Sequence, residues 1–277
     1  MPMPAPRFRG SVRRSHRARQ PNPARYSAPA LAKGLEILEL FASEPSGLTI
    51  SEAARKLGRT VGEIFRMLVC LEERGYISQS SSDERFELTL KLFELAHRHP
   101  PLERLVAEAR PLMEEVAHKT GQSCHLAMLS NGEVIVVAHV DAPRTAGFGV
   151  RLGARIDLLN TASGHLILAF RRSAMRTRSL AEWKRRGHRA FPRGLAAHLA
   201  LIHKRGYEEM PSYQVRGVTN IAFPVLNQHG EAIAALSVPF LARIGDHVGP
   251  DDVKKALREA SAKLSRAVGG KQSGDRS

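Results

Sequence analysis

The sequence predicts an α+β protein with an N-terminal winged helix-turn-helix and a C-terminal domain built on an antiparallel sheet. Three observations lead to this prediction. Two helix-start signals follow each other around Gly58, two short strand-like runs come next, and beyond Gly121 the apolar residues alternate with a period of two. At 277 residues the chain is long enough for two separate cores.

The chain begins with a basic tail, residues 1–28, that holds seven arginines, five prolines and no acidic residue. Because large apolar residues are few, we expect the tail to be disordered, as we do for residues 269–277. The prolines argue against an organelle transit helix, and no apolar segment of a secretory signal is present. The net charge of +15 suits a polyanionic partner. A solvated extension, an arm that binds this partner and a misassigned start codon all stay open.

The domain predicted over residues 29–90 begins with a helix. Leu31, Leu35 and Leu38 repeat at helical spacing, with Ile37 and Phe41 beside them. This helix supplies the third element that a helix-turn-helix needs to close a small core.

Two capping boxes define the next two helices. Thr49 with Glu52 begins one helix and Thr60 with Glu63 begins another, and Gly58 allows the tight turn between them. One face of the second helix carries the apolar Ile64, Met67, Leu68 and Leu71, and the other carries Arg59, Gly62, Arg66 and Glu73. A polar face on a second helix after a tight turn is the geometry that enters the DNA major groove.

The segment that follows reads as a wing. Tyr76-Ile77 and Phe86-Glu87-Leu88 are strand-like runs on either side of the polar loop 80–85. An ordinary helical hairpin in a core is the alternative, but the third helix and the wing favour DNA binding. The residues that we predict to contact DNA are Ser51, Arg59, Thr60, Gly62, Glu63, Arg66 and Arg85. Among them, Arg66 is assigned to a base and Ser51 to a phosphate.

A linker helix is predicted over residues 91–100. Thr89 can cap a helix through Leu90, Phe93 and Ala96, and His99-Pro100-Pro101 breaks it. A further helix from about Leu102, interrupted or restarted at Pro111, ends near Gly121.

Two hairpins and several helices make up the second domain, residues 101–268. Asn131-Gly132 joins the alternating run from Cys124 to the strand 134–137, and residues 227–230 join the strands 221–225 and 232–238. Helices are expected from about Thr161 to Phe170, Ala196 to Lys204 and Asp251 to Val268. An antiparallel sheet with helices on its faces is typical of an α+β sensor domain.

Neither the cysteines nor the apolar runs point to secretion or a membrane. Cys70 and Cys124 are the only cysteines, too few for a disulfide framework or a Cys-rich zinc site. No run approaches the roughly twenty apolar residues that a membrane span requires.

Histidines invite a catalytic reading, which the spacing does not support. His125 and its neighbour Cys124 face opposite sides of a strand, so adjacency does not bring them together. His139 with Asp141, and His165, lack the His-x-x-x-His spacing of a metal site. The sequence therefore predicts no catalytic residue, no metal site and no cofactor, and we do not expect an enzyme.

The segment Asn160-Thr161-Ala162-Ser163-Gly164 can place a helix N-terminus against an anion, because free N–H groups and the helix dipole attract negative charge. A capped helix start, with Gly164 allowing close packing, is an equally good reading.

Motifs along the chain resemble the isocitrate-lyase-regulator (IclR) family of bacterial transcription factors. The resemblance runs from about Ala28 to Val268 and rests on LTISEAARKLG, LEERGYI, ELTLKLFELA, NGEVIVVAHV, LLNTASGHLILAF, RGYE and RGVTNIAFPVLNQHGEAIAALSVPF, in this order. It implies a winged DNA-binding domain, a GAF-like domain that binds a small effector, and homodimers or homotetramers on palindromic operator DNA. Such a repressor or activator would be cytoplasmic and nucleoid-associated.

The resemblance also implies an effector site. A cysteine and two serines of the last hairpin hold the effector carboxylate in well-studied members, and Asn220, Ser237 and Pro239 stand at the matching positions here. With the helix start, the predicted effector residues are Asn160, Thr161, Ala162, Ser163, Gly164, Asn220 and Ser237.

Two further departures from the family pattern affect specificity. The usual Ser-Thr pair at the start of the recognition helix is Val61-Gly62 here, and Met210-Pro211 replaces a usual acidic residue. A larger or aromatic acid therefore suits the pocket better than glyoxylate or pyruvate.

The sequence thus favours a ligand-responsive regulator of catabolic genes. The alternatives are a hydrolase-type enzyme in the C-terminal domain, whose ligand would be turned over, and a sequence-indifferent architectural protein, which would bind operator and random DNA equally.

Overall fold

A computed structural model describes residues 28–80, 83–97, 100–143, 147–187, 190–245 and 247–270. The chain divides into two compact units, Met1–Leu95 and Ala96–Ser277, and each is described by itself. The expected tails at residues 1–27 and 271–277 lie outside the described residues, as do Ser81, Ser82 and His99. Within the described ranges, no helix combines the length and apolar character that a bilayer crossing requires.

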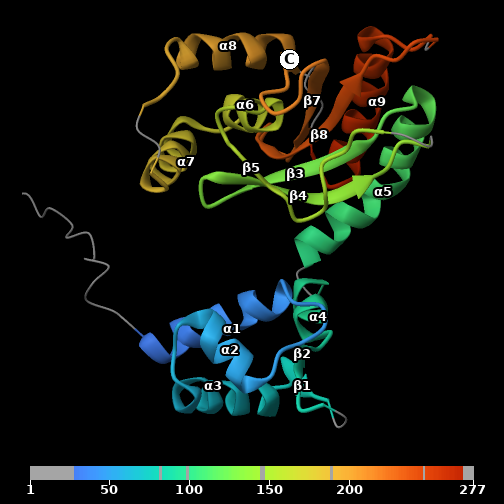
Figure 1. The fold of residues 1–277 in the computed structure, drawn as a ribbon. Helices are drawn as coiled ribbons and strands as arrows, with labels where there is room; N and C mark the ends of the chain where they lie inside the picture. The colour runs from blue at the N-terminus through green and yellow to red at the C-terminus, as the bar shows by residue number, and fades with distance from the viewer. Residues whose placement is uncertain are drawn as a thin grey trace, which may run out of the picture. The chain divides into compact units, whose positions relative to one another are not determined.

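The N-terminal unit is a winged helix-turn-helix (Figure 1). Its elements are α1 (Pro29–Ala42), α2 (Ile50–Leu57), α3 (Val61–Glu73), β1 (Ile77–Gln79), β2 (Phe86–Leu88) and the start of α4 (Lys91–His97). The two strands pair antiparallel with Ser78 opposite Glu87. Ile37, Ile64 and Leu68 are fully buried in a core between the three helices and the wing. The predicted winged fold is confirmed.

Both predicted capping boxes form in the structure. Thr49 accepts a hydrogen bond from the Glu52 backbone N–H and Thr60 accepts one from that of Glu63, while each glutamate accepts one in return. Gly58 adopts φ 62°, the left-handed conformation that glycine takes without steric cost. Local hydrogen bonding alone therefore places the turn.

The face that α1 buries differs from the prediction. Leu31 and Leu35 are 64% and 51% exposed, whereas Ile37 and Phe41 enter the core. The leucine repeat is real, but more than half of Leu31 and of Leu35 stays uncovered by the described part of this unit.

The C-terminal unit is built on a six-stranded antiparallel sheet. In spatial order the strands are β5 (Arg155–Ile156), β4 (Glu133–Val140), β3 (Cys124–Ser130), β8 (Ala232–Leu241), β7 (Val218–Leu226) and β6 (Glu208–Pro211). Asn131 and Gly132, both at positive φ, make the tight turn between β3 and β4 as predicted. The central pairing of β3 with β8 joins the two predicted hairpins into one sheet.

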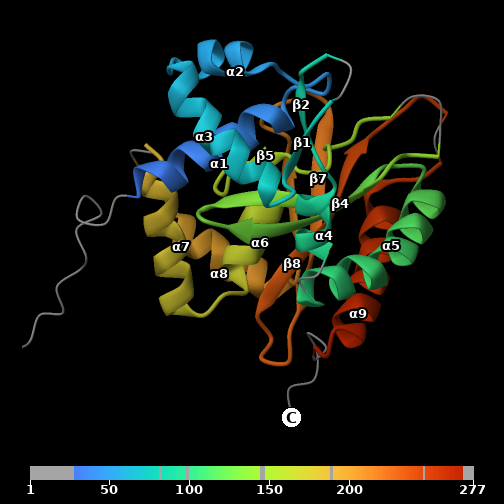
Figure 2. The same ribbon diagram turned by 90° about the horizontal axis from the view of Figure 1, so that it is seen from below.

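Helices cover both faces of this sheet (Figures 1 and 2). On one face α5 (Pro100–Thr120) packs beside α9 (Pro250–Ala267), and on the other α6 (Ala162–Ala169) packs beside α8 (Leu195–Arg205), with α7 (Ser173–Arg185) beyond. Neighbouring residues of β3 therefore enter different cores: Leu126 contacts the α5 and α9 side, and Ala127 the α6 side.

One expectation for this unit is wrong, and three of its elements were not predicted. The helix expected to be interrupted at Pro111 is continuous, because the proline removes only one N–H donor while Ala109 and Met113 on either side are fully buried against the sheet. Helix α7 and the edge strands β5 and β6 were not predicted. Among the residues of α7 only Ser179 and Trp183 are buried, so the helix carries little apolar periodicity.

Candidate functional site

The start of α3 presents an open surface. Val61 and Phe65 are 49% and 51% exposed, and Arg66 is exposed beside them. Arg66 makes no hydrogen bond or ion pair with any described residue, and a Cβ added at Gly62 would meet nothing within 4 Å. This part of the helix is accessible to a partner, and Val61 and Phe65 add two apolar side chains that the sequence reasoning left out.

Two other predicted DNA contacts are engaged with α1. Arg59 Nη2 lies 2.6 Å from Glu36 Oε2, and Lys33 Nζ lies 2.7 Å from Glu63 Oε1. Hydrogen bonds from Lys33 and Thr60 lower the pKa of Glu63 to about 2, so this carboxylate is charged at neutral pH. These ion pairs hold the start of α3 against α1.

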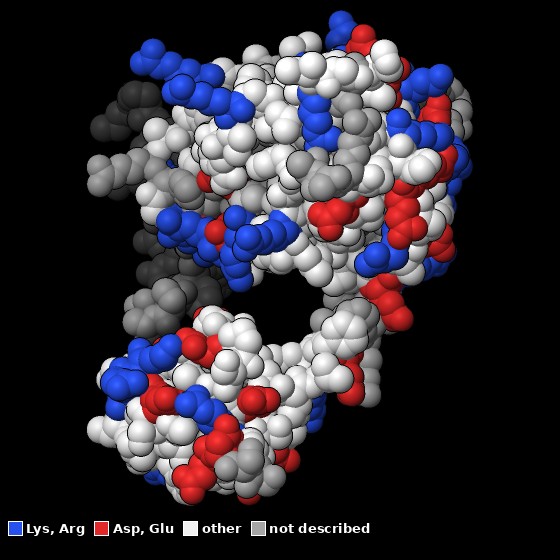
Figure 3. All heavy atoms as spheres, turned by 45° about the vertical axis from the view of Figure 1, so that its right-hand side comes forward, with Lys and Arg blue, Asp and Glu red and all other residues white. Residues whose placement is uncertain are grey.

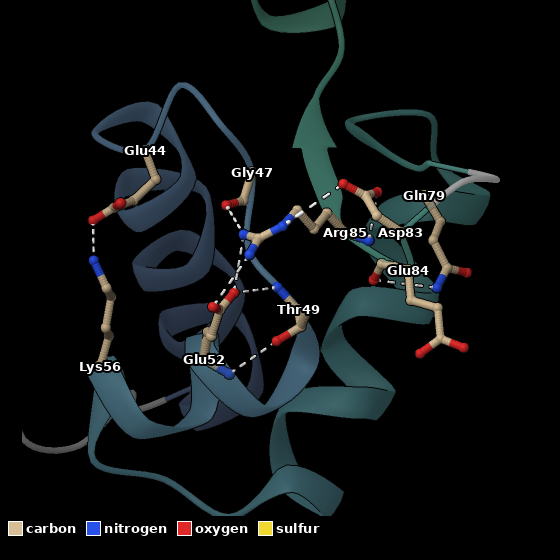
Figure 4. A network of polar contacts seen from close by, with 9 residues as sticks. All are labelled: Glu44, Gly47, Thr49, Glu52, Lys56, Gln79, Asp83, Glu84 and Arg85. Atoms are coloured by element: carbon tan, nitrogen blue, oxygen red, sulfur yellow. Dashed lines mark hydrogen bonds and ion pairs between the residues drawn. The ribbon is translucent and has the colours of Figure 1, made fainter.

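Arg85 braces the wing against α2 (Figure 4). Its guanidinium donates to Glu52 Oε2 at 3.1 Å, to Glu52 Oε1 at 3.3 Å and to the Gly47 carbonyl at 3.0 Å. The Thr49 backbone N–H and Arg85, against the opposing effect of burial, lower the pKa of Glu52. Contacts of Arg85, Arg59, Thr60 or Glu63 with DNA stay predictions, as does that of the exposed Ser51.

Residues 28–95 do not carry the chain's positive charge. They hold 8 Lys and Arg against 11 Asp and Glu, a net charge of −3. On the face that Figure 3 draws, basic and acidic side chains are interspersed over this unit. The seven arginines of residues 1–28, outside the described residues, reverse the sign for the N-terminal third of the chain.

In the C-terminal unit a small cavity lies where the N-terminus of α6 meets the sheet. Five of the predicted effector residues line it: Thr161, Ala162, Ser163, Asn220 and Ser237. The remaining lining residues are His125, Phe148, Val150, Ile156, Ser212, Tyr213 and Gln214. The space of about 30 Å³ holds a water molecule or two but nothing larger without movement of the lining.

The polar side chains of this cavity are hydroxyls, amides and one imidazole, and none of its described lining residues is acidic. Ser163 Oγ and Ser237 Oγ, both buried, are hydrogen-bonded at 2.8 Å. Thr161 caps α6 by accepting from the Gly164 N–H at 3.2 Å. The N–H groups of Ala162 and Ser163 have no acceptor among the described residues, because the first N–H groups of a helix have no carbonyl within the helix to bond.

His125 adds an uncharged imidazole to the cavity wall. It stands opposite Ser237 on β8 and opposite His139 on β4, and its buried Nδ1 has no hydrogen-bond partner among the described residues. Burial, helped by the nearby His139, lowers the pKa of His125 to about 4. Cys124 points into the other core, where burial raises the pKa of its thiol. The two side chains therefore do not form a nucleophile and base.

Two predicted effector residues lie outside this lining. The Asn160 side chain donates to Asp157 Oδ1 at 2.9 Å in the turn before α6. A Cβ at Gly164 would lie 2.1 Å from the Leu158 carbonyl oxygen, so this glycine permits α6 to pack against the preceding backbone. For Gly164 the structure favours the close-packing reading.

Several lining residues escaped the sequence reasoning. Phe148 and Val150 come from the segment after β4, and Ser212, Tyr213 and Gln214 from the segment after β6. Neither segment has periodicity or a turn signal that would place it over α6. Only for His125 did the sequence offer a usable signal, because the strand alternation placed it on the face opposite to Cys124.

Two family models match this chain. The IclR helix-turn-helix domain matches residues 30–81, and the bacterial transcriptional regulator IclR C-terminal domain matches residues 102–266. Among curated relatives, the HTH-type transcriptional regulator XynR of Escherichia coli (strain K12) is 27% identical over 247 residues, which cover 87% of this chain and 97% of the relative. The HTH-type transcriptional regulator KdgR of the same organism is 28% identical over 247 residues, 88% and 94% of the two chains.

Solved structures match this chain over nearly all of its length. An IclR homolog from Microbacterium hydrocarbonoxydans, complexed with 4-hydroxybenzoate, has a TM-score of 0.71 and 25% identity over 86% of this chain and 98% of its own. The IclR of Thermotoga maritima has a TM-score of 0.66 and 26% identity, again over 86% and 98% of the two chains. The similarity spans both the winged unit and the sheet unit.

Proposed function

This chain belongs to the IclR family of ligand-responsive, DNA-binding transcriptional regulators, and we propose that it controls catabolic genes in response to a small organic acid bound at the N-terminus of α6. The family consists of regulators, so an enzymatic role for the C-terminal domain has no support in its relatives. The observation that carries the proposal is the convergence of unpaired donors on a cavity without acidic lining.

A carboxylate suits this cavity for electrostatic reasons. The N–H groups of Ala162 and Ser163 carry the positive end of the α6 dipole, and such a helix terminus stabilises an anion. The hydroxyls of Ser163 and Ser237 currently bond each other, and each can redirect its proton to a carboxylate oxygen. Asn220, on the facing strand, supplies an amide donor.

The rest of the lining favours an acid with an aromatic or apolar body. Phe148, Val150, Ile156 and Tyr213 supply the apolar and aromatic part of the lining. The related regulator from Microbacterium hydrocarbonoxydans was crystallised with an aromatic acid, 4-hydroxybenzoate. Since the space is only about 30 Å³, an aromatic ring requires the segments around Phe148 and Tyr213 to move outward on binding.

Isothermal titration of the full-length protein with 4-hydroxybenzoate, benzoate and pyruvate tests this proposal. We expect at least one aromatic acid to bind, and Ser237→Ala and Asn220→Ala to weaken it about tenfold each, the effect of losing roughly 1.4 kcal/mol of hydrogen bonding. Thr219→Ala is the matched control, because Thr219 neighbours Asn220 on β7 but is not part of the cavity lining. Unchanged affinity in both cavity variants, with folding intact, places the acid elsewhere.

On the DNA side, we propose that α3 enters the major groove with Arg66 facing a base. Arg66 has no hydrogen bond or ion pair with the described residues, which supports this role. Arg59, Glu63 and Arg85 instead form ion pairs within the unit. Val61 and Phe65 lie beside Arg66, and apolar side chains at such positions contact thymine methyl groups.

We further propose that the regulator acts as a homodimer or homotetramer. Leu31, Leu35 and Leu90 of the winged unit are more than half exposed, which is an unusual cost for an isolated domain and fits a surface that a second copy covers. Light scattering of the purified protein measures the mass directly.

A further inference from the structure

Three metal-binding residue types far apart in the sequence meet beside α6. His165 comes from α6, His198 from α8 and Glu208 from β6, and one ligand atom of each lies within 4.8 Å of the others. Figures 1 and 2 show α8 running beside α6, and β6 also contacts α6. None of the three residues lines the effector cavity.

The hydrogen bond of His165 fixes which ring nitrogen faces the cluster. Its Nε2 lies 2.9 Å from the Leu159 carbonyl oxygen, and because a carbonyl only accepts, Nε2 carries the proton. In the neutral ring Nδ1 is then a bare acceptor. It lies 3.7 Å from Glu208 Oε2 and has no hydrogen-bond partner among the described residues. The His165 side chain is only 9% exposed.

The hydrogen bonds of Glu208 likewise fix which of its oxygens faces the two histidines. Its side chain is fully buried, and Oε1 is held by the Arg205 guanidinium and by the Glu209 N–H at 2.8 Å. The other oxygen, Oε2, faces His165 and lies 2.7 Å from His198 Nε2. Burial opposes charge on Glu208, but the positive Arg205 guanidinium, His198 and the Glu209 N–H outweigh it and lower its pKa, so the carboxylate is ionised at neutral pH.

We propose that His165 Nδ1, His198 Nε2 and Glu208 Oε2 bind a divalent transition-metal ion, with Zn²⁺ the best match. Two imidazoles and one carboxylate are a zinc ligand set that leaves a fourth tetrahedral position for water. The Leu159 carbonyl on His165, and Arg205 with the Glu209 N–H on Glu208, are the outer hydrogen bonds that orient metal ligands in proteins.

The distances fit after a small movement of one side chain. Ligands of a tetrahedral zinc, each about 2.0–2.1 Å from the ion, stand roughly 3.3 Å apart. The His165–Glu208 distance of 3.7 Å is near this value, and the His198–Glu208 distance of 2.7 Å must lengthen. The ring nitrogens of His165 and His198, which lie within 4.8 Å of each other, must also reach this spacing. The His198 side chain is 39% exposed at the surface of α8, so its ring has room to move.

A proton on His165 Nδ1 would also satisfy the Glu208 oxygen that faces it. The metal and proton alternatives differ in consequence. A metal would tie α6, α8 and β6 together with a stoichiometry of one ion per chain, and α6 is the helix whose N-terminus forms the effector cavity. A proton leaves no such stoichiometry.

The test is metal binding by the full-length protein after chelation and buffer exchange. We expect one Zn²⁺ per chain by elemental analysis at micromolar free zinc, a rise in melting temperature with Zn²⁺, and a Co²⁺ derivative whose visible spectrum lacks thiolate charge transfer. His198→Ala and Glu208→Gln should each weaken Zn²⁺ at least tenfold. His203→Ala, an exposed histidine of the same helix, is the matched control and should bind as the wild type does.

His198→Ala keeps the proposal open to refutation even if the buried Glu208→Gln variant fails to fold. Equal zinc affinity in the wild type and His198→Ala would overturn it, because the ion would then sit at another histidine or at Cys70. Failure of the wild type to retain zinc at micromolar concentration would also overturn it and leave the cluster as a protonated ion pair. Neither result bears on acid binding, which is measured with metal-free protein.

Discussion

Arg66 is the residue on which DNA specificity is expected to depend. A guanidinium that donates two hydrogen bonds to a guanine discriminates by roughly 1–3 kcal/mol. Arg66→Ala should therefore weaken binding about 5- to 150-fold at the preferred operator and much less at an operator changed at the contacted base. Arg55→Ala, an exposed arginine of α2, controls for loss of charge alone. An equal loss at every operator variant would reassign Arg66 to a phosphate.

His125 makes the C-terminal unit sensitive to acid. Its pKa is about 4 in the folded protein, against an ordinary value of 6.5, so the unfolded chain binds a proton that the folded chain excludes. Stability from this residue is complete above pH 6.5 and falls as the pH drops towards 4, by about 3 kcal/mol in total. Urea unfolding at pH 7 and pH 5 should show a smaller decrease for His125→Gln than for the wild type. The same decrease in both proteins would contradict the assignment.

At the scale of elements, the position of α6 depends on one glycine. A Cβ at residue 164 would lie 2.1 Å from the Leu158 carbonyl oxygen, and backbone cannot yield as a side chain does. Gly164→Ala should cost about 1–3 kcal/mol of unfolding free energy and disturb acid binding, since α6 carries the N–H groups of the cavity. Gly34→Ala, in α1 with open space around it, should instead stabilise by up to about 1 kcal/mol. Denaturant unfolding measures both, and equal effects would refute the packing argument.

The elements that the sequence predicted correctly are those fixed by local chemistry. Capping boxes at Thr49 and Thr60, the Asn131-Gly132 turn and the cap at Thr161 each depend on residues within a few positions, so spacing alone located them. Helix α7 escaped because it buries little apolar surface, and the continuity of α5 through Pro111 depends on packing against the sheet.

The candidate sites divide along the same line. The α6 terminus was visible as a helix start, and the family resemblance supplied Asn220 and Ser237. The cluster of His165, His198 and Glu208 was not foreseen, because its members are 33 and 10 residues apart and no periodicity relates them. Only the packing of α8 and β6 around α6 brings them together.

At the scale of the whole molecule, charge is distributed unevenly. Residues 28–95 have a net charge of −3, so we expect the seven arginines of residues 1–28 to supply phosphate attraction that this unit lacks. Removal of residues 1–28 should weaken binding to operator and unrelated duplexes alike. It should also flatten the dependence of affinity on salt by about 0.9 ion per lost phosphate contact. A truncated, folded protein that loses operator preference would show that the tail reads sequence.

On the proposed function, ligand binding must also change the affinity for DNA. A ligand shifts that equilibrium only as far as its affinities for the DNA-competent and DNA-released states differ. The present cavity of about 30 Å³ does not admit an aromatic ring, so the segments around Phe148 and Tyr213 must move when such an acid binds. If that movement is easier in one of the two states, the affinities differ and the requirement is met.

The most direct test is the affinity for the DNA segment upstream of the protein's own gene, located by footprinting and titrated by fluorescence anisotropy across concentrations of the acid that calorimetry identifies. The account predicts that operator affinity changes at least several-fold in the wild type, with a midpoint at the acid's dissociation constant. In Ser237→Ala the midpoint should move about tenfold higher, while affinity without acid stays the same. An identical midpoint in both proteins would contradict it. So would a footprint that is no more specific on the upstream segment than on random DNA.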